Sequence, residues 1–298
     1  MSKEKLKKYG TTFHFASQFL GKSHMEATAA LYSICREIDD IADINENSEL
    51  ARNELLHLKE SLERGTPDHP IAVQAFAIAP SLSIDVLVEL IDGAILDTYA
   101  VGIRTELELL QYCYQVAGTV GLLMCDLFEV QDPIARHHAI DLGVAMQLTN
   151  ICRDVKEDAK NNRRYLPLEL IGDLSPIEIL SASEEAKLSI KKAVSHLLHE
   201  ADIRYKSGIS GLCFLPPQPR IAILMAALIY REIGVLIEDR NFNIWLGRVH
   251  TSTKRKLMVA CRGVLVFMFS RKVHRYQGYH DSSLHRGLSL RPGVHWAS

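Results

Sequence analysis

Apolar residues recur along almost the whole chain at the three- and four-residue spacing of an α-helix. Strand-like alternation of apolar and polar residues is scarce, and no hairpin dipeptide separates two apolar runs. Short stretches with Gly and Pro interrupt the pattern, as at residues 65–67 and 216–217. We therefore predict an all-α protein with helices over residues 23–43, 48–64, 69–79, 83–101, 105–130, 133–160, 183–207, 219–240 and 251–273.

The breaks between these helices are short and loop-like, and no repeat of solenoid period divides the chain. A chain of 298 residues can form one large core or two small ones. We predict a single domain over residues 1–298. Its last part, from about 274 to 298, is rich in His, Ser, Gly and Arg, and we expect it to be a loosely packed tail.

Composition narrows the classes of function. Hydrophobic residues make up 47% and charged residues 23%, which is typical of a globular protein. The net charge of -2 provides no basic field for nucleic acid, so an anionic ligand would need local cations or a metal ion. The longest apolar run, residues 257–270, is interrupted by Arg262 and too short to span a bilayer, so we expect a buried helix. The six cysteines lack C-x-x-C spacing, which favours reduced thiols over a zinc site.

A first acidic cluster lies on the predicted helix 23–43, where Arg36, Asp39, Asp40 and Asp43 share one face. Asp39 and Asp43 are four residues apart, or about 6 Å along the helix axis. Two carboxylates at this spacing repel each other, and a divalent cation would turn that repulsion into attraction. A solvated face is the alternative, because apolar residues occupy the opposite side of this helix.

A second polar stripe is harder to explain as a solvated face. Gln147, Asn150, Asp154 and Asp158 align on a helix that is otherwise apolar nearly all round, and such a helix is normally buried. Buried polar groups need hydrogen-bond partners, water or a metal ion. The stripe therefore predicts a wet cavity or a metal site, and its oxygen donors suit Mg²⁺ or Mn²⁺ better than iron or zinc.

With these two clusters, the chain resembles the squalene and phytoene synthase family, most of all the bacterial phytoene synthases. The resemblance runs along nearly the whole length, and the order of its motifs is specific. The motifs are TTFHFAS at 11–17, LYSICREIDDIAD at 31–43, LVELIDGAILD at 87–97, YCYQVAGTVGLL at 112–123, QLTNICRDVKEDAKNNRRYLP at 147–167 and IYREIGVLIE at 229–238.

The resemblance implies an isoprenoid synthase fold, a helical bundle around a central cavity, in which Arg36 and Arg153 contact substrate diphosphates. Tyr165 would close over these diphosphates and, with Arg36 and the aspartates, belong to the catalytic set. The implied ligands of Mg²⁺, with Mn²⁺ as an alternative ion, are Asp39, Asp43, Asn150, Asp154 and Asp158. Further implied substrate contacts are Thr12, Phe13, Tyr32, Tyr112, Ala117, Val120, Gly121, Gln147, Tyr230, Lys254 and Arg255.

Plainer interpretations exist for several of these residues. A single Tyr on an apolar helix is often a core residue with a satisfied hydroxyl. Lys254 and Arg255 fit a solvated basic patch equally well. The small residues at 117–121 could serve close helix packing, although in the family this stretch lines the cavity and leaves room for a prenyl tail.

The resemblance also implies the reaction, which is the head-to-head condensation of two geranylgeranyl diphosphates to phytoene through a cyclopropyl diphosphate, a step of carotenoid biosynthesis. The wording AGTVG at 117–121 and HDSSLH at 280–285 favours this product, and no NADPH is expected. The alternative is a farnesyl diphosphate-using squalene, dehydrosqualene or presqualene diphosphate synthase. An alternative of another class is a catalytically silent helical scaffold, against which both intact aspartate motifs and Tyr165 weigh.

The expected partners are prenyl diphosphates and no nucleic acid. Because the substrates and product are greasy, we predict a cytoplasmic protein with a transient, peripheral contact at the inner membrane. The basic segment from Lys3 to Lys8 is one candidate for that contact, and a merely solvated tail is the alternative.

Overall fold

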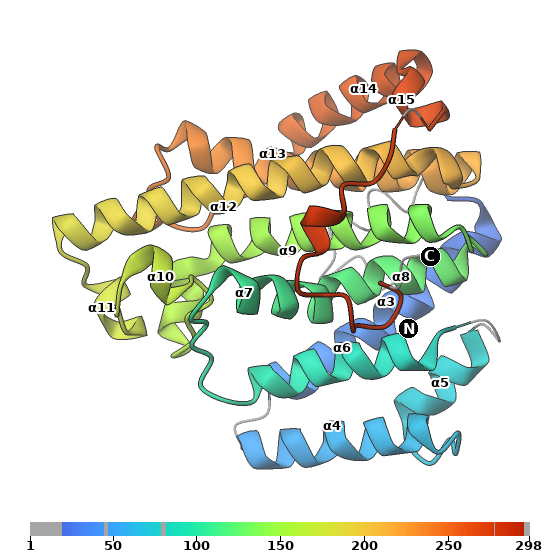
Figure 1. The fold of residues 1–298 in the computed structure, drawn as a ribbon, viewed down its shortest axis with the longest axis horizontal. Coiled ribbons are helices and arrows are strands. Elements are labelled where there is room, and N and C mark those ends of the chain that lie inside the picture. The colour runs from blue at the N-terminus through green and yellow to red at the C-terminus, as the bar shows by residue number, and fades with distance from the viewer. Residues whose placement is uncertain (1–19, 45–46, 79–81, 277, 295–298) are drawn as a thin grey trace.

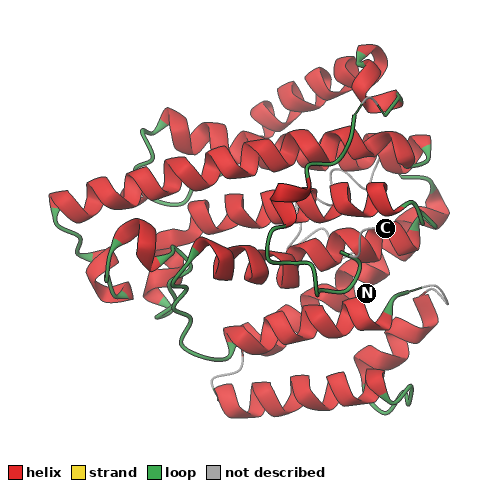
Figure 2. Cartoon of the chain, viewed as in Figure 1, coloured by secondary structure: helices red, strands yellow, loops and turns green. Residues whose placement is uncertain are grey.

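The structure is a computed structural model that describes residues 20–44, 47–78, 82–276 and 278–294. Within these ranges every regular element is helical, as Figure 2 shows, and Gly102 and Arg164 form an isolated β-bridge. The all-α prediction is confirmed. The longer helices are α3 (Lys22–Ile44), α4 (Ser48–Glu63), α5 (Pro70–Ile78), α6 (Ile84–Asp97), α7 (Glu106–Cys113), α8 (Thr119–Leu127), α9 (Pro133–Lys160), α12 (Glu184–Gly211), α13 (Pro217–Asp239) and α14 (Thr253–Phe269). The short ones are η1 (Tyr114–Gly118), α10 (Leu168–Ile171), α11 (Pro176–Leu180), η2 (Leu212–Phe214), η3 (Ile244–Leu246), α15 (Arg271–His274) and η4 (Ser282–His285).

Helix α9 runs through the middle of the bundle, with α12 and α13 on one side and α3, α7 and α8 on the other (Figure 1). Asp132 caps its start: the side chain accepts a hydrogen bond from the backbone N–H of Ile134 at 2.8 Å. Pro133 occupies the first turn, where its missing N–H costs nothing. Apolar residues are buried on several sides of α9, so this helix is a central part of the core.

Several helix boundaries differ from the predicted ones: α12 ends at Gly211 instead of residue 207, α14 ends at Phe269 instead of residue 273, and two further differences have a visible cause. Helix α6 ends at Asp97, not at residue 101, because Thr98 closes it with a hydrogen bond from its hydroxyl to the carbonyl of Ile95 at 2.7 Å. The helix predicted over residues 105–130 is interrupted by the π-helical turn η1 between α7 and α8. A π-turn is a single wider turn within a helix, and the prediction of one continuous helix did not identify it.

The expectation of a loosely packed tail was wrong for residues 278–294. Leu288 and Val294 are fully buried, and the Gln111 side chain donates a hydrogen bond to the carbonyl of Gly287 at 3.2 Å. Figure 1 shows this segment crossing in front of α9 towards α6. The segment contains little helix, but its polar groups form hydrogen bonds with side chains of the helical bundle. Each of the six cysteines is a free thiol, which agrees with the sequence-based expectation.

Candidate active site

A cavity of about 550 Å³ lies between α3, α8, α9 and α13. Most of its wall is apolar, with residues such as Leu142, Met146 and Ile223. Polar side chains gather in one part of the lining, on α3 and on the second half of α9. Ten predicted site residues line this cavity: Tyr32, Arg36, Asp39, Ala117, Val120, Gly121, Gln147, Asn150, Arg153 and Tyr230.

Glycines set how closely the cavity walls approach each other. A Cβ on Gly121 would overlap the carbonyl of Ala139, and a Cβ on Gly143 would overlap the carbonyl of Ala117. Only glycine allows η1 and α8 to lie this close to α9. The small residues at 117–121 therefore serve close packing, and Ala117, Val120 and Gly121 also line the cavity. That they leave room for a prenyl tail stays a prediction.

We call the part of the cavity where these polar side chains gather its mouth. Its α3 side carries the first acidic motif. The Arg36 guanidinium lies 2.6 Å from a carboxylate oxygen of Asp40, and Asp39 is open to solvent. Protein atoms crowd Asp39 on its other sides, and the neighbouring carboxylates of Asp43 and Asp97 add repulsion. Together they raise the pKa of Asp39 to about 7, against the opposing effect of Arg36. The protein therefore does not fully compensate the negative charge of the ionised Asp39 carboxylate.

On the α9 side of the mouth, arginines bind the carboxylate of Asp154. Asp154 accepts two hydrogen bonds from Arg153, at 2.8 and 2.5 Å, and two from Arg248, at 2.7 and 2.9 Å. Burial alone would raise the pKa of Asp154, but these hydrogen bonds outweigh it and keep the pKa below its usual value. Arg248 also lines the cavity. Sequence reasoning missed this residue because it lies in a loop, 94 positions from its partner.

Asp97, at the end of α6, connects the two motifs and was also missed as a site residue. It accepts hydrogen bonds from the hydroxyls of Tyr165 at 2.6 Å and Tyr112 at 2.9 Å, and these two rings stack with centroids 4.9 Å apart. Arg163 donates to the Asp97 carbonyl at 3.1 Å and to the Asp43 carboxylate at 2.7 Å. The available signal was an aspartate ending an apolar helix within the motif at 87–97.

The carboxylates of this region repel each other across the two motifs. Burial raises the pKa of Asp97 to about 6, and burial with the charge of Asp154 raises that of Asp158 to about 7. Asn150 Oδ1 is buried and has no hydrogen-bond partner in the described part of the chain. Uncompensated carboxylates beside an unpartnered amide oxygen form a donor set that suits a hard divalent cation.

Not every predicted residue reaches this site. Asp43, Asp154 and Asp158 do not line the cavity, and neither do Tyr112 and Tyr165, which donate hydrogen bonds to Asp97. Arg255 pairs with Glu232 and Asp239 of α13, and Lys254 is exposed; neither lines the cavity. The role of Lys254 and Arg255 in substrate binding therefore remains a prediction without geometric support. Thr12, Phe13 and the segment from Lys3 to Lys8 lie outside the described residues.

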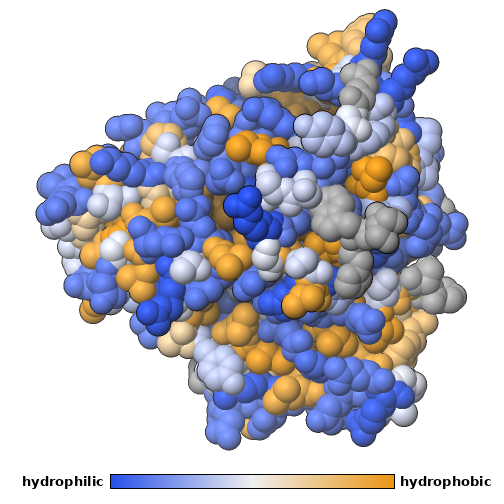
Figure 3. Space-filling view, viewed as in Figure 1, coloured by the Kyte–Doolittle hydropathy of each residue, from blue (hydrophilic) through white to orange (hydrophobic). Residues whose placement is uncertain are grey.

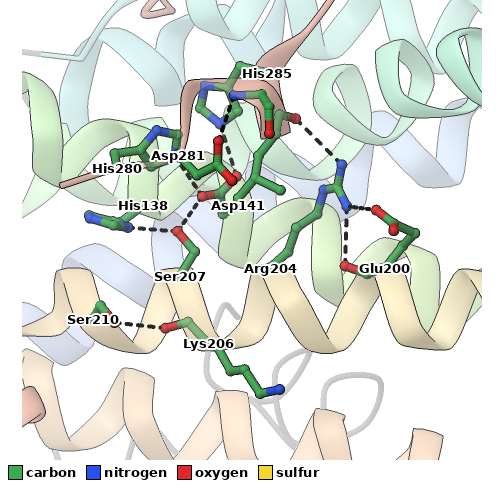
Figure 4. Close-up of polar contacts among 12 residues, drawn as sticks. His138, Asp141, Glu200, Arg204, Lys206, Ser207, Ser210, His280, Asp281 and His285 are labelled. Carbon is green, nitrogen blue, oxygen red and sulfur yellow. Dashed lines mark hydrogen bonds and ion pairs between the residues drawn. The ribbon is translucent and has the colours of Figure 1, made fainter. Parts of the chain in front are cut away.

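A second group of metal-ligand side chains surrounds Asp141 of α9 (Figure 4). Ligand atoms of His138, Asp141 and His280 lie within 4.8 Å of one another, and all three residues are buried. His280 Nε2 and His285 Nε2 lie 2.7 and 2.9 Å from the two carboxylate oxygens, and Ser207 donates to the same carboxylate. These are hydrogen-bond distances, and the carboxylate is satisfied by side-chain donors alone. We interpret the group as a hydrogen-bonded anchor for the segment 278–294.

Comparisons with known proteins extend over most of the chain. The family model described as squalene/phytoene synthase matches residues 6–255. A phytoene synthase of Pseudescherichia vulneris is 31% identical, and the match covers 83% of this chain and 84% of that protein. For a phytoene synthase of Thermus thermophilus the identity is 34%, with 89% and 91% covered. The crystal structure of a dehydrosqualene synthase in complex with a ligand has a TM-score of 0.77 at 25% identity, covering 90% of this chain and 95% of that one.

Proposed function

The chain belongs to the squalene/phytoene synthase family, and from this premise we propose that it condenses two geranylgeranyl diphosphates head to head to phytoene. The proposed reaction passes through a cyclopropyl diphosphate and needs no nicotinamide reductant. Two observations support it: the apolar cavity with a charged mouth, and the coverage of more than four fifths of the chain by proteins called phytoene synthase. The first of these carries the proposal.

The mouth of the cavity is the proposed binding place of the two diphosphates. Arg36 and Arg153 line it, and a planar guanidinium can bind two phosphate oxygens at once. Tyr165 follows α9 in the segment 161–167, and we propose that this segment covers the bound diphosphates while Asp97 positions the tyrosine. These side chains would hold the leaving group in place and separate it from bulk water.

Magnesium, or manganese in its place, would neutralise the diphosphate and favour its departure when bound at the mouth. The raised pKa values of Asp39 and Asp158 support this assignment, because a bound cation offsets repulsion between carboxylates. The unpartnered Oδ1 of Asn150 supports it as well. The proposed ligands are Asp39, Asp43, Asn150, Asp154 and Asp158.

The apolar part of the cavity is the proposed place of the prenyl chains. Loss of diphosphate leaves an allylic cation, which the double bond of the second substrate attacks. Such a cation survives only where water is excluded, and the wall around Leu142, Met146 and Ile223 is largely apolar. Ala117, Val120 and Gly121 present little side-chain bulk there, which leaves room for a long chain.

A farnesyl-using reaction is the second candidate. The similarity to the dehydrosqualene synthase structure favours it, since that protein shares the fold over 90% of this chain. A catalytically silent scaffold is the third candidate, and the two intact aspartate motifs, from which Asp39 and Asn150 line the cavity, weigh against it.

Supplying one substrate at a time separates these candidates. Purified protein is incubated with farnesyl or geranylgeranyl diphosphate, with and without Mg²⁺ and NADPH, and the hydrocarbons are identified by mass spectrometry. We expect phytoene from geranylgeranyl diphosphate only when Mg²⁺ is present, with no effect of NADPH. Products built only from farnesyl units would overturn the substrate assignment. Absence of turnover with either diphosphate would favour the scaffold.

A further inference from the structure

Helix α14 buries one face and leaves the opposite one open. Val259, Ala260 and Gly263 are buried against α13, and a Cβ on Gly263 would overlap the side chain of Met225, so the helices pack closely. The expectation that residues 257–270 form a buried helix was therefore wrong for the outer face. Helix α14 lies at the edge of the bundle in Figure 1, on the far side of α13 from α9.

The open face of α14 is apolar. At 100° per residue its large exposed side chains fall within an arc of about 120°, with Cys261 in the same arc. Isolated exposed apolar residues are ordinary, but a contiguous set on one helix face marks an interaction surface. Apolar side chains are visible at the upper edge of Figure 3, over α14. Each of the following is more than half exposed: Leu257, Met258, Leu265, Met268 and Phe269, the last at 76%.

Basic residues surround this face. Residues 240–280 contain nine Lys and Arg and no Asp or Glu, so every acidic residue of the chain lies elsewhere, although the net charge is -2. Arg255 is turned inward to Glu232. In contrast, Arg262 on the edge of the face and Arg271 and Lys272 just after it are exposed and form no ion pair with the described residues.

We propose that the outer face of α14 lies in the surface of an anionic lipid bilayer. Leu265, Met268 and Phe269 would enter the boundary between headgroups and acyl chains, and Arg262 and Lys272 would contact lipid phosphates. A basic amphipathic helix with a wide apolar face is suited to this position. None of the described helices is long and apolar enough to cross a membrane, so the helix would lie along the surface.

Charge favours a bilayer over a second copy of the chain as the occupant. A symmetric dimer through this face would bring Arg262, Arg271 and Lys272 of both copies together, and like charges across an interface repel. An anionic surface instead complements them. Helix α13 places Ala222, Ile223 and Tyr230 on the cavity, while α14 covers its outer side. With α14 bound to the bilayer surface, only α13 would separate the apolar cavity from the membrane-bound helix.

The apolar contact is tested by vesicle flotation of the full chain, using phosphatidylcholine vesicles with and without phosphatidylglycerol. We expect binding to the anionic vesicles, a loss of at least tenfold in Leu265→Glu and Phe269→Glu, and no loss in the control Ile177→Glu. Ile177 is 72% exposed on α11 and provides a matched surface position. Unchanged binding in both α14 variants would overturn the proposal.

The electrostatic contact is tested by reversing single charges. Each basic residue near an anionic surface contributes about fivefold to the binding constant, so Arg262→Glu and Lys272→Glu should each weaken binding by that factor or more. The control is Lys192→Glu on α12, which is exposed and distant from the face. Added salt should weaken the wild type towards the variants. Equal weakening by the control would contradict a localised contact.

Cys261 reports the location directly, because it is the exposed one of six free cysteines. A polarity-sensitive dye on Cys261 should shift its emission to the blue when anionic vesicles are added, and Cys261→Ser provides the labelling background. An unshifted spectrum would overturn the proposal. So would sedimentation velocity showing a dimer that Leu265→Glu dissociates, if vesicles do not bind. Vesicle binding that is lost only on deletion of residues 2–8 would assign the contact to the amino-terminal segment instead. None of these readouts depends on catalytic activity.

Discussion

Asp97 and Asp154 show two different ways in which the fold holds a carboxylate at the cavity mouth. Asp97 accepts hydrogen bonds from neutral tyrosine hydroxyls, and its pKa is raised to about 6. Asp154 is bound by two guanidinium groups, and its pKa is lowered. A charge at Asp154 is therefore secured before any ligand arrives. The carboxylates around Asp97 are not fully neutralised by cationic side chains, so they can interact with a bound cation.

Replacing Asp154 by Asn tests the α9 part of the site. We expect the fold to persist, because an amide fits the same polar stripe, and kcat to fall about a hundredfold or more, because an amide cannot offset a cation. The measurement is steady-state condensation of geranylgeranyl diphosphate over a range of Mg²⁺ concentrations, with circular dichroism for the fold.

Asp202→Asn is the control for Asp154→Asn, because Asp202 also pairs with an arginine, but that arginine, Arg231, does not line the cavity as Arg153 and Arg248 do. Near-normal activity of Asp154→Asn with an unchanged Mg²⁺ requirement would contradict the assigned role. Equal losses in both variants would point to a general effect of breaking an ion pair.

Which residues of the site could be predicted depends on whether their partners are near in sequence. Asp39 could be placed on one face of its helix with Asp43, and Asn150 on one face of another helix with Asp154, because the helical period fixes the direction of side chains three or four apart. Arg248 and Asp97 could not be assigned in this way. The contacts of Arg248 with Asp154 and of Asp97 with Arg163 and Tyr165 join residues 66 to 94 positions apart, and no local spacing encodes such a contact.

At the scale of elements, the contact between α8 and α9 sets the width of the cavity. Helical periodicity predicted both helices, but it could not predict the π-turn η1 or the overlap that a Cβ at Gly143 would cause. These features depend on how two distant surfaces meet. The outer face of α14 shows the same limit, because its apolar residues fit a buried helix and an exposed one equally well.

Gly143→Ala tests this close approach. The added methyl group would meet a backbone carbonyl, that of Ala117, which cannot move aside as a flexible side chain could. We expect the free energy of unfolding to fall by about 1–3 kcal/mol, measured by urea denaturation. The control is Gly234→Ala in α13, where the new methyl would meet only the tip of Leu198. Because alanine favours helix, this variant should be neutral or more stable by up to about 1 kcal/mol. Equal stability of both variants would contradict the packing argument.

At the scale of the whole molecule, the group around Asp141 joins the segment 278–294 to the central helix. Burial alone would raise the pKa of Asp141, but hydrogen bonds from His280 and His285 keep it well below its usual range. Burial, with repulsion from neighbouring histidines, lowers the pKa of His137 and His138 to about 4. The sequence did not predict this anchor, because a polar segment without helical period normally indicates a loose tail.

The lowered pKa of His138 predicts a pH dependence of stability. Between the pKa of about 6.5 in the unfolded chain and about 4 in the fold, the unfolded chain binds a proton that the folded chain does not. The stabilisation is therefore complete above pH 6.5 and is lost as the pH falls towards 4. Relative to His138→Gln, the wild type should lose roughly 1–2 kcal/mol between pH 7 and pH 5.

Urea denaturation of both proteins over this pH range measures the difference. The carboxylates at the cavity mouth shift stability in the opposite direction, because their raised pKa values favour the protonated fold, and their contribution cancels between wild type and variant. A difference that stays constant from pH 7 to pH 5 would contradict a buried neutral His138.

The anchor at Asp141 also bears on synthesis by the ribosome. Asp141 is made 139 residues before His280, and at about 5–20 residues per second this separation corresponds to roughly 7–30 seconds. During that interval α9 already carries Asn150 and Asp154, but the carboxylate in its first half lacks the imidazole donors that satisfy it in the finished fold. We therefore expect α9 to stay incompletely packed in the nascent chain until translation has passed residue 285. Co-translational folding of this protein should therefore end with the segment 278–294, the part of the chain whose sequence indicates the least structure.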